Sequence, residues 1–257
     1  MPQKNAPIAV FDSGLGGISV LRELVRLMPD EDYLYFGDSK NAPYGPRTAA
    51  QVHQLTAAAA GMLFERGCKA LVVACNTATS AAITPLRADN PDRIVIGIEP
   101  ALKPAVMAFD HPNVLVMATE MTLKEEKFHL LMDSYRDQAE IYRLPAPGIV
   151  ASVERGITEG AELDAYLEEI LAPYRDKAIE AIVLGCTHFP LVEKAIAKAM
   201  GRSVQIFDGA EGTARETRRR LEETDLRRDG TGIGQVELTN SLGTDEILQI
   251  SRKLLEG

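Results

Sequence analysis

The chain has 257 residues, 46% hydrophobic and 25% charged, a composition typical of a globular protein of one or two domains. Its formal net charge of -9 argues against a general nucleic-acid binder, which usually carries a basic face. No apolar run approaches the roughly 20 residues that span a bilayer, and the first residues lack the apolar segment of a signal peptide. Three cysteines are too few for a disulfide framework, so we expect free thiols in a cytoplasmic protein without a membrane partner.

The first hundred residues alternate short apolar runs with amphipathic helical patterns. Strands are predicted at 8–11, 33–36, 71–74 and 94–98, with helices between them. Thr48 and Gln51 form a capping-box pattern at the start of one helix, which runs to about Arg66. This alternation favours a parallel α/β sheet, because parallel strands need a crossover that is usually a helix.

The pattern starts again at a strand predicted at 114–117. Thr122 and Glu125 resemble a second capping box, and an amphipathic helix between Leu163 and Tyr174 precedes a strand at 181–184. A strand near 204–207, a helix from about 210 and a closing helix at 244–255 complete the prediction, with 224–234 as the only linker-like stretch.

The two halves place similar residues at similar separations. The distance along the chain from Asp12 to Cys75 is close to that from Thr119 to Cys186. Each half would then put a polar cluster at one strand end and a cysteine after another. The sequence therefore predicts two similar parallel-sheet α/β halves related by pseudo-symmetry.

Cys75 and Cys186 each follow an apolar run of the kind found in strands buried on both faces. Residues just past such strands lie at the carboxyl edge of the sheet, where open α/β sheets bind ligands. Polar residues follow both cysteines: Asn76 and Thr77 after the first, Thr187 and His188 after the second. A thiol that exchanges protons needs such neighbours, because its pKa of about 8.5 must be tuned. Cys68 lacks them and is interpreted as a small buried hydrophobe.

The glycine-rich stretch Gly14-Leu15-Gly16-Gly17 lies between a predicted strand and a predicted helix. A dinucleotide fingerprint would need a third glycine where Ser19 stands, and no phosphate-binding G-K-S/T motif occurs. Free N–H groups at a helix N-terminus also attract smaller anions such as a carboxylate. We therefore expect a small acidic ligand here, with Asp12 and Ser13 at the mouth of its site.

Three kinds of chemistry could use the two cysteines. Cys186, His188 and Cys75 could bind zinc, but structural zinc sites more often contain Cys-x-x-Cys pairs, which do not occur here. A hydrolase with a Cys186–His188 pair would leave Cys75 without a role. Two thiols suit the inversion of a stereocentre without cofactor or metal, because each must act as acid in one direction and as base in the other.

Four short segments carry a resemblance to a known family. They are Asp12-Ser13-Gly14-Leu15-Gly16-Gly17, Gly37-Asp38 with Pro43-Tyr44-Gly45, Ala74-Cys75-Asn76-Thr77-Ala78, and Leu184-Gly185-Cys186-Thr187-His188-Phe189-Pro190. In order and spacing, between about residues 8 and 210, the chain closely resembles bacterial glutamate racemases of the aspartate/glutamate racemase superfamily.

The resemblance implies racemisation of L- and D-glutamate without pyridoxal phosphate or metal, to supply D-glutamate for peptidoglycan. By similarity, Cys75 would exchange the α-proton on the D-glutamate face, assisted by Asp12. Cys186 would exchange it on the L-glutamate face, assisted by His188 and Glu154. The substrate-binding residues that the resemblance implies are Asp12, Ser13, Tyr44, Gly45, Asn76, Thr77, Thr119, Thr122, Thr187 and His188.

The resemblance also implies two α/β domains with the active site in the cleft between them. The first would comprise residues 1–99 and 208–257, and the second residues 100–207. Three segments depart from the family pattern: 119–126, 206–210 and the Leu144-Pro145-Ala146-Pro147 stretch before Glu154. These departures affect the expected glutamate selectivity and the expected position of Glu154. They do not affect the two thiols. A homodimer is expected, and the alternatives are a racemase of aspartate or another acidic amino acid, or a catalytically weak binding protein.

Overall fold

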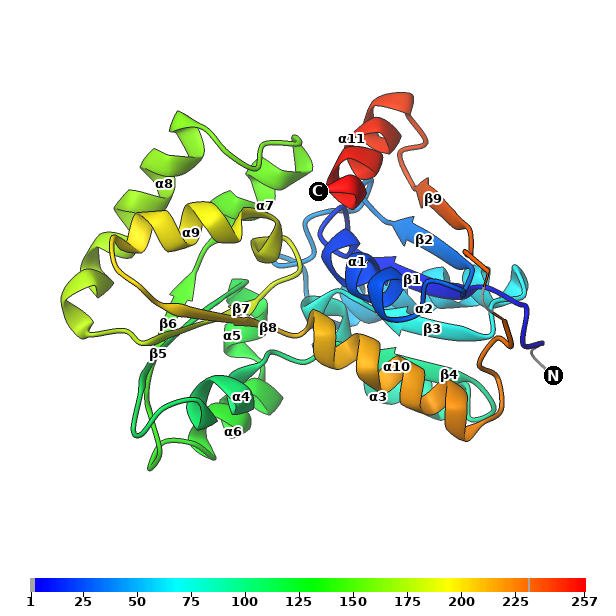
Figure 1. The fold of residues 1–257 in the computed structure, drawn as a ribbon, viewed down its shortest axis with the longest axis horizontal. Helices are drawn as coiled ribbons and strands as arrows, with labels where there is room; N and C mark the ends of the chain where they lie inside the picture. Colours follow the sequence, from blue (N-terminus) through cyan, green and yellow to red (C-terminus); the bar gives the residue numbers. More distant parts are fainter. Residues whose placement is uncertain (1–2, 231) are drawn as a thin grey trace.

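The computed structural model describes residues 3–230 and 232–257, which form two α/β lobes (Figure 1). The first lobe contains a five-stranded parallel sheet, and the second a four-stranded parallel sheet, among the described residues. The predicted fold class, two parallel-sheet α/β domains, is confirmed.

The first sheet has the strand order β4-β3-β1-β2-β9. Its interior strands are buried on both faces, as the apolar runs predict. Helices α1, α10 and α11 pack on one face, and α2 and α3 on the other. The strands are β1 (Ile8–Asp12), β2 (Tyr33–Gly37), β3 (Ala70–Val73), β4 (Ile94–Gly97) and β9 (Val236–Asn240), and the helices are α1 (Ile18–Leu27), α2 (Ala49–Glu65), α3 (Asn76–Asp89), α10 (Ala210–Glu223) and α11 (Asp245–Glu256).

The second sheet has the strand order β6-β5-β7-β8. Helices α4, α5 and α6 cover one face, and α7, α8 and α9 the other. The strands are β5 (Asn113–Ala118), β6 (Glu140–Pro145), β7 (Ala181–Gly185) and β8 (Gln205–Asp208). The helices are α4 (Leu102–Met107), α5 (Glu120–Lys124), α6 (Glu126–Asp133), α7 (Pro147–Glu154), α8 (Ala161–Leu171) and α9 (Glu193–Met200), with 3₁₀ turns η1 (Ala172–Lys177) and η2 (Phe189–Val192).

The two sheets repeat one topology. Read from the other edge, β8-β7-β5-β6 corresponds strand for strand to β4-β3-β1-β2, and β9 is an addition to the first sheet. The cysteine strands β3 and β7 are therefore equivalent, and each lies next to the strand that begins its half, β1 or β5. The expected pseudo-symmetry is present in the strand order.

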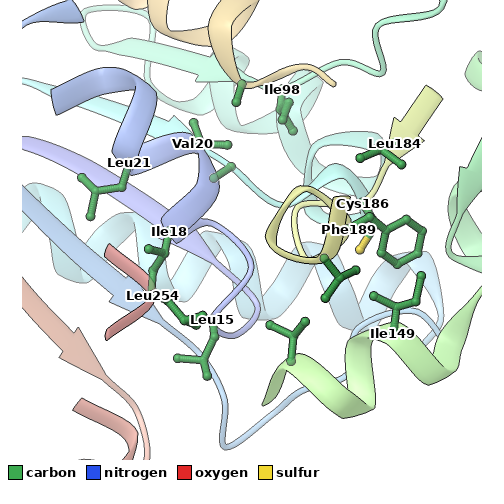
Figure 2. Close-up of a cluster of buried hydrophobic side chains, with 14 of the residues drawn as sticks. Leu15, Ile18, Val20, Leu21, Ile98, Ile149, Leu184, Cys186, Phe189 and Leu254 are labelled. Atoms are coloured by element: carbon green, nitrogen blue, oxygen red, sulfur yellow. The ribbon is translucent and has the colours of Figure 1, made fainter. Parts of the chain in front are cut away.

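One apolar cluster extends through both lobes (Figure 2). It contains Leu15 and Ile18 near the start of α1, and Ile149 and Phe189 from the second lobe. These side chains are fully buried, so their packing contributes about 2 kcal/mol each. This shared core holds the carboxyl edges of the two sheets toward each other.

Two strands were not predicted. In β6 the charged Glu140 and Arg143 are exposed and Pro145 ends the strand, so the apolar signal is weak. In β9 the alternation is Val236-Glu237-Leu238, and the strand pairs with β2. The chain thus returns to the first sheet at its end. The proposed boundaries, 1–99 plus 208–257 and 100–207, stay a prediction.

Of the two capping boxes, one is confirmed and one is wrong. Thr48 and Gln51 form both reciprocal bonds at the start of α2. In the second half the cap is Thr119, whose hydroxyl accepts from the Thr122 N–H, while Glu125 is the N-cap of the following helix. Thr122 lies three positions after Thr119, which is the spacing of an N-cap hydrogen bond.

The stretch 224–234 is not a free linker. Arg227 forms ion pairs with Asp30 and Glu31, and the Arg228 N–H donates to Glu31. Thr231 lies outside the described residues. Within 3–230 and 232–257, no helix combines the length and apolar character that crossing a membrane requires.

Candidate active site

A cavity of about 460 Å³ lies between the carboxyl edges of the two sheets. Both sulfur-bearing side chains that the sequence singled out, Cys75 and Cys186, line it. Its other lining residues are Ser13, Ser39, Ala42, Pro43, Tyr44, Gly45, Pro46, Asn76, Thr77, Thr119, Glu120, Pro147, Val150, Ala151, Glu154, Thr187, His188, Leu242 and Ile247. The cavity is therefore built by both lobes.

Cys75 lies at the N-terminus of α3, just past β3. Its sulfur accepts a hydrogen bond from the Ala78 N–H at 3.4 Å and donates one to the Ser13 hydroxyl at 3.4 Å. Burial, and next the negative charge of Asp12, raise the pKa of the Cys75 thiol to about 12. With this pKa the side chain is a protonated thiol at neutral pH.

Asp12 ends β1 and is fully buried behind the cavity wall. One carboxylate oxygen accepts from the Gly14 N–H, and the other accepts from the Thr187 hydroxyl, both at 2.9 Å. Burial raises the pKa of Asp12 above its ordinary value, although the charge of His188 opposes this. Asp12 thus acts on the cavity through its charge near Cys75.

Cys186 belongs to a chain of three residues. Its sulfur lies 3.6 Å from His188 Nδ1, and His188 Nε2 lies 2.7 Å from a carboxylate oxygen of Glu154. Burial alone would lower the pKa of His188, but the hydrogen bonds to Cys186 and Glu154 raise it well above 6.5. These two partners favour the protonated imidazole, which would present an N–H to the Cys186 sulfur.

Glu154 reaches from the end of α7 into the first lobe. Its carboxylate accepts from the Leu15 N–H at 2.6 Å and from the Ser39 hydroxyl at 3.0 Å. Burial opposes ionisation, but the bonds from His188, Leu15 and Ser39 outweigh it and lower the pKa of Glu154. The carboxylate is thus held as an anion.

The glycine-rich loop binds carboxylates of the protein itself. The expectation was that its N–H groups would hold a ligand, but Gly14 donates to Asp12 and Leu15 donates to Glu154. Glycine is required at positions 14 and 16 for a steric reason. A Cβ on Gly14 would overlap the Glu154 carboxylate, and one on Gly16 would overlap the His188 ring.

A cluster of hydroxyls joins the two lobes at the cavity. The Thr77, Thr119 and Thr122 side-chain oxygens lie 3.0–3.5 Å from one another. Thr77 and Thr119 line the cavity, whereas Thr122 is buried behind them. Asn76 also lines the cavity, and its Oδ1 is buried and without a hydrogen-bond partner among the described residues. A rotation of the Asn76 side chain would present this acceptor to a ligand in the cavity.

Tyr44 and Gly45 also line the cavity. The Tyr44 hydroxyl donates to Asp38 at 2.7 Å, and a Cβ on Gly45 would lie 3.3 Å from Thr119. The predicted site residues line the cavity, except Asp12 and Thr122, which are buried behind its wall. Ser39 was not predicted, although it directly follows the Gly37-Asp38 segment.

No group of three or more His, Cys, Asp or Glu side chains is arranged to hold a metal ion in the part of the chain that the structure describes. Cys75 and Cys186 are both free thiols, as is Cys68, which is buried in the core below β3.

Comparison with known proteins places the chain in a family. The model of the Asp/Glu/hydantoin racemase family matches residues 8–217. Glutamate racemase of Clostridium perfringens (strain SM101) is 49% identical over 253 residues, covering 98% of this chain and 97% of that protein.

Two solved structures show the same fold. Glutamate racemase of Francisella tularensis, in complex with D-glutamate, superposes with a TM-score of 0.84 at 27% identity, covering 99% of this chain and 95% of that one. Glutamate racemase of Escherichia coli, in complex with L-glutamate and the activator UDP-MurNAc-Ala, gives 0.83 at 31% identity, covering 97% and 95%. The chain belongs to the Asp/Glu/hydantoin racemase family and, within that family of isomerases, to the glutamate racemases.

Proposed function

We propose that this protein racemises glutamate by a two-thiol mechanism without pyridoxal phosphate or metal. The observation that carries the proposal is that Cys75 and Cys186, from equivalent strands of two sheets, line one cavity. The D-glutamate and L-glutamate bound in the two related structures support glutamate as the substrate.

From L-glutamate, Cys186 removes the α-proton as a thiolate, and the Cys75 thiol delivers its own proton to the opposite face. The C–H bond breaks on one side and forms on the other, so Cys186 ends protonated and Cys75 ends as the thiolate. In the reverse direction the two roles exchange. His188 supports Cys186, and Glu154 holds His188 in place.

The high pKa of Cys75 suits its role as the acid, but it must also act as a base on D-glutamate. An ammonium group of the substrate in the same cavity would bring a positive charge close to the Cys75 sulfur. A nearby cation stabilises a thiolate in a buried site, where electrostatic interactions are weakly screened. We therefore propose that substrate binding itself prepares Cys75 for proton abstraction.

The polar side chains of the cavity supply the substrate contacts in this proposal. Asn76 Oδ1 and the Thr187 hydroxyl, whose own hydrogen goes to Asp12, accept from the ammonium, and the hydroxyls of Thr77 and Thr119 bind carboxylate oxygens. Ser13, Tyr44 and Gly45 complete the wall, and Thr122 and Asp12 hold these groups from behind.

The wider role follows from the product. We propose that the protein supplies D-glutamate for peptidoglycan, in the cytoplasm, as a homodimer. Light scattering on the purified protein measures the mass, and a mass of one chain, 28.0 kDa, would contradict the dimer.

The decisive experiment is to incubate the protein with L-glutamate in D2O without added cofactor. Optical rotation and deuterium at the α-carbon are followed together. We expect optical rotation to be lost while deuterium enters the D product. The second thiol exchanges its proton with D2O and then delivers deuterium to the α-carbon. Turnover of aspartate alone would change the substrate and keep the mechanism, whereas no turnover of either would contradict the proposal.

A further inference from the structure

The Ser39 hydroxyl lies between Glu154 and a residue of the C-terminal strand. It donates to one Glu154 oxygen at 3.0 Å and accepts from the Asn240 side-chain amide at 2.9 Å. Asn240 is the last residue of β9 and is nearly buried. A continuous path of hydrogen bonds thus runs from Asn240 through Ser39, Glu154 and His188 to Cys186.

The direction of this path is fixed by its far end. Asn240 Oδ1 accepts from the Leu242 N–H at 3.0 Å, so its NH2 group must face Ser39. The Ser39 oxygen then receives an amide hydrogen, and its own hydrogen can go only to the Glu154 carboxylate. The Asn240 amide and the Ser39 hydroxyl therefore both donate in the direction of the Glu154 carboxylate.

We propose that Ser39 and Asn240 are positioning residues for the Cys186 half of the reaction. The inference rests on the proposed racemase function and extends it to residues outside the family segments noted in the sequence. The Glu154 oxygen that Ser39 binds is not the one that faces His188, so Ser39 fixes the rotation of the carboxylate. Asn240 acts one step further out, because it does not line the cavity.

Loss of the Ser39 hydroxyl would leave one Glu154 oxygen without its donor. The titratable groups that interact with this carboxylate are His188, with Cys186 behind it, on the second lobe, and, through charge, Asp12 and Tyr35 on the first. His188 and the Leu15 N–H both bind the other Glu154 oxygen, and the Tyr35 hydroxyl donates to the Gly14 carbonyl. None of these groups therefore replaces the lost hydrogen bond. The anionic form of Glu154 is then less favoured, and the His188 ring is held less firmly.

The test uses Ser39→Ala and Asn240→Asp in the full-length protein. Asn240→Asp keeps the side-chain shape and the acceptor for Leu242, but removes the donor to Ser39. We expect kcat for glutamate to fall about tenfold in Ser39→Ala with a smaller change in KM, since hydrogen bonds to charged groups have effects of this size. The acidic limb of the kcat/KM profile should move to higher pH, because Glu154 becomes easier to protonate.

Two further variants separate positioning from a purely structural role. Ser39→Thr retains the hydroxyl and should restore kcat and the pH profile. Ser241→Ala is the matched control: its hydroxyl accepts from the Lys40 N–H in the same loop but does not reach Glu154, so kcat should stay at the wild-type value. The double variant Ser39→Ala/Asn240→Asp should lose no more activity than Ser39→Ala alone, because both changes break one path.

The inference is overturned if Ser39→Ala and Asn240→Asp match Ser241→Ala in kcat and pH profile. It is also overturned if all three lose activity in proportion to a fall in melting temperature. These outcomes leave the racemase proposal standing, because wild-type turnover of glutamate is measured in the same assay. Failure of the wild-type protein to racemise glutamate would instead contradict the proposed function.

Discussion

The hydroxyl of Thr187 donates a hydrogen bond to the Asp12 carboxylate at 2.9 Å, although Asp12 ends a strand of one sheet and Thr187 follows a strand of the other. The Gly14 N–H occupies the other oxygen of Asp12. With both oxygens engaged and the side chain fully buried, Asp12 influences the cavity through its charge. That charge acts on Cys75.

Replacing Asp12 by Asn should lower the pKa of Cys75 from about 12, because the negative charge that disfavours the thiolate is removed. The pKa can be measured from the pH dependence of alkylation in a Cys68→Ala/Cys186→Ala background, which leaves one thiol. Asp208→Asn provides the control, since this partly buried carboxylate ends a strand of the other sheet. An unchanged alkylation profile in Asp12→Asn would show that the charge is not felt at the sulfur.

Cys75→Ala and Cys186→Ala should each reduce racemisation by at least about 1000-fold, because each removes the acid or base needed on one face. Cys68→Ala is the matched control. That thiol lies in the core below β3, and burial raises its pKa to about 11, so activity should stay near the wild-type rate. Racemisation at the wild-type rate in either of the first two variants would rule out the two-thiol mechanism.

Glu154→Gln should destabilise the fold by about 3 kcal/mol near pH 5.5, because it breaks a largely buried ion pair with His188. The lowered pKa of Glu154 contributes stability above pH 4.5 that is lost as pH falls through its folded value. The raised pKa of His188 contributes stability below pH 6.5 that is lost as pH rises through its folded value.

The difference in unfolding free energy between wild type and Glu154→Gln should therefore peak between these limits and shrink toward high pH. Urea unfolding at several pH values measures it. Glu162→Gln removes an exposed partner of Arg155 and should produce a much smaller difference with little pH dependence. A difference that grows steadily with pH would contradict the assignment of charges to this pair.

Gly16→Ala should reduce racemisation by more than about 100-fold while the protein stays folded. The new methyl group would overlap the His188 ring and come within 2.6 Å of the Thr187 hydroxyl, and misplacement of about 1 Å has effects of this size. Gly61→Ala is the control, because a Cβ there meets no atom within 4 Å in α2 and should add about 1 kcal/mol of stability. Full activity in Gly16→Ala would mean that the loop can move aside.

Lys69→Met should destabilise the protein by about 3 kcal/mol, because it leaves the buried Glu31 carboxylate without its nearest cation. The ion pair, 2.5 Å long, lies at the opposite end of the first sheet from the cavity, so kcat should not change. Lys124→Met breaks an exposed pair with Glu120 and serves as the control, with a far smaller loss expected in urea unfolding. Equal losses in both variants would show that burial of the first pair has no energetic effect.

The sequence predicts those parts of the molecule in which a local pattern carries the information. The apolar runs before Cys75 and Cys186 predict β3 and β7, because strands buried on both faces must be continuously apolar. The half-exposed β6 and β9 carry no such run, and their place in the sheets depends on pairing with distant partners. A two-residue alternation at Val236-Glu237-Leu238 is the only local signal for β9.

The sequence likewise predicts only part of the site. The short segments around Cys75 and His188 identify site residues, because each segment lies at the end of a single strand. The contact between Ser39 and Asn240 joins residues 201 positions apart, and no pattern in either neighbourhood predicts it. The donors to Asp12 and Glu154 in the glycine loop likewise depend on how α7 docks, which local sequence does not specify.

The position of β9 has a consequence for synthesis on the ribosome. Strand β2 pairs with β9, which follows the whole second lobe in the chain, so the open edge of β2 stays uncovered while residues 38–235 are being made. Exposed strand edges in nascent chains are prone to association with other chains. Covering this edge also delivers Asn240 to Ser39, so protection from aggregation and completion of the site would occur in the same late step of translation.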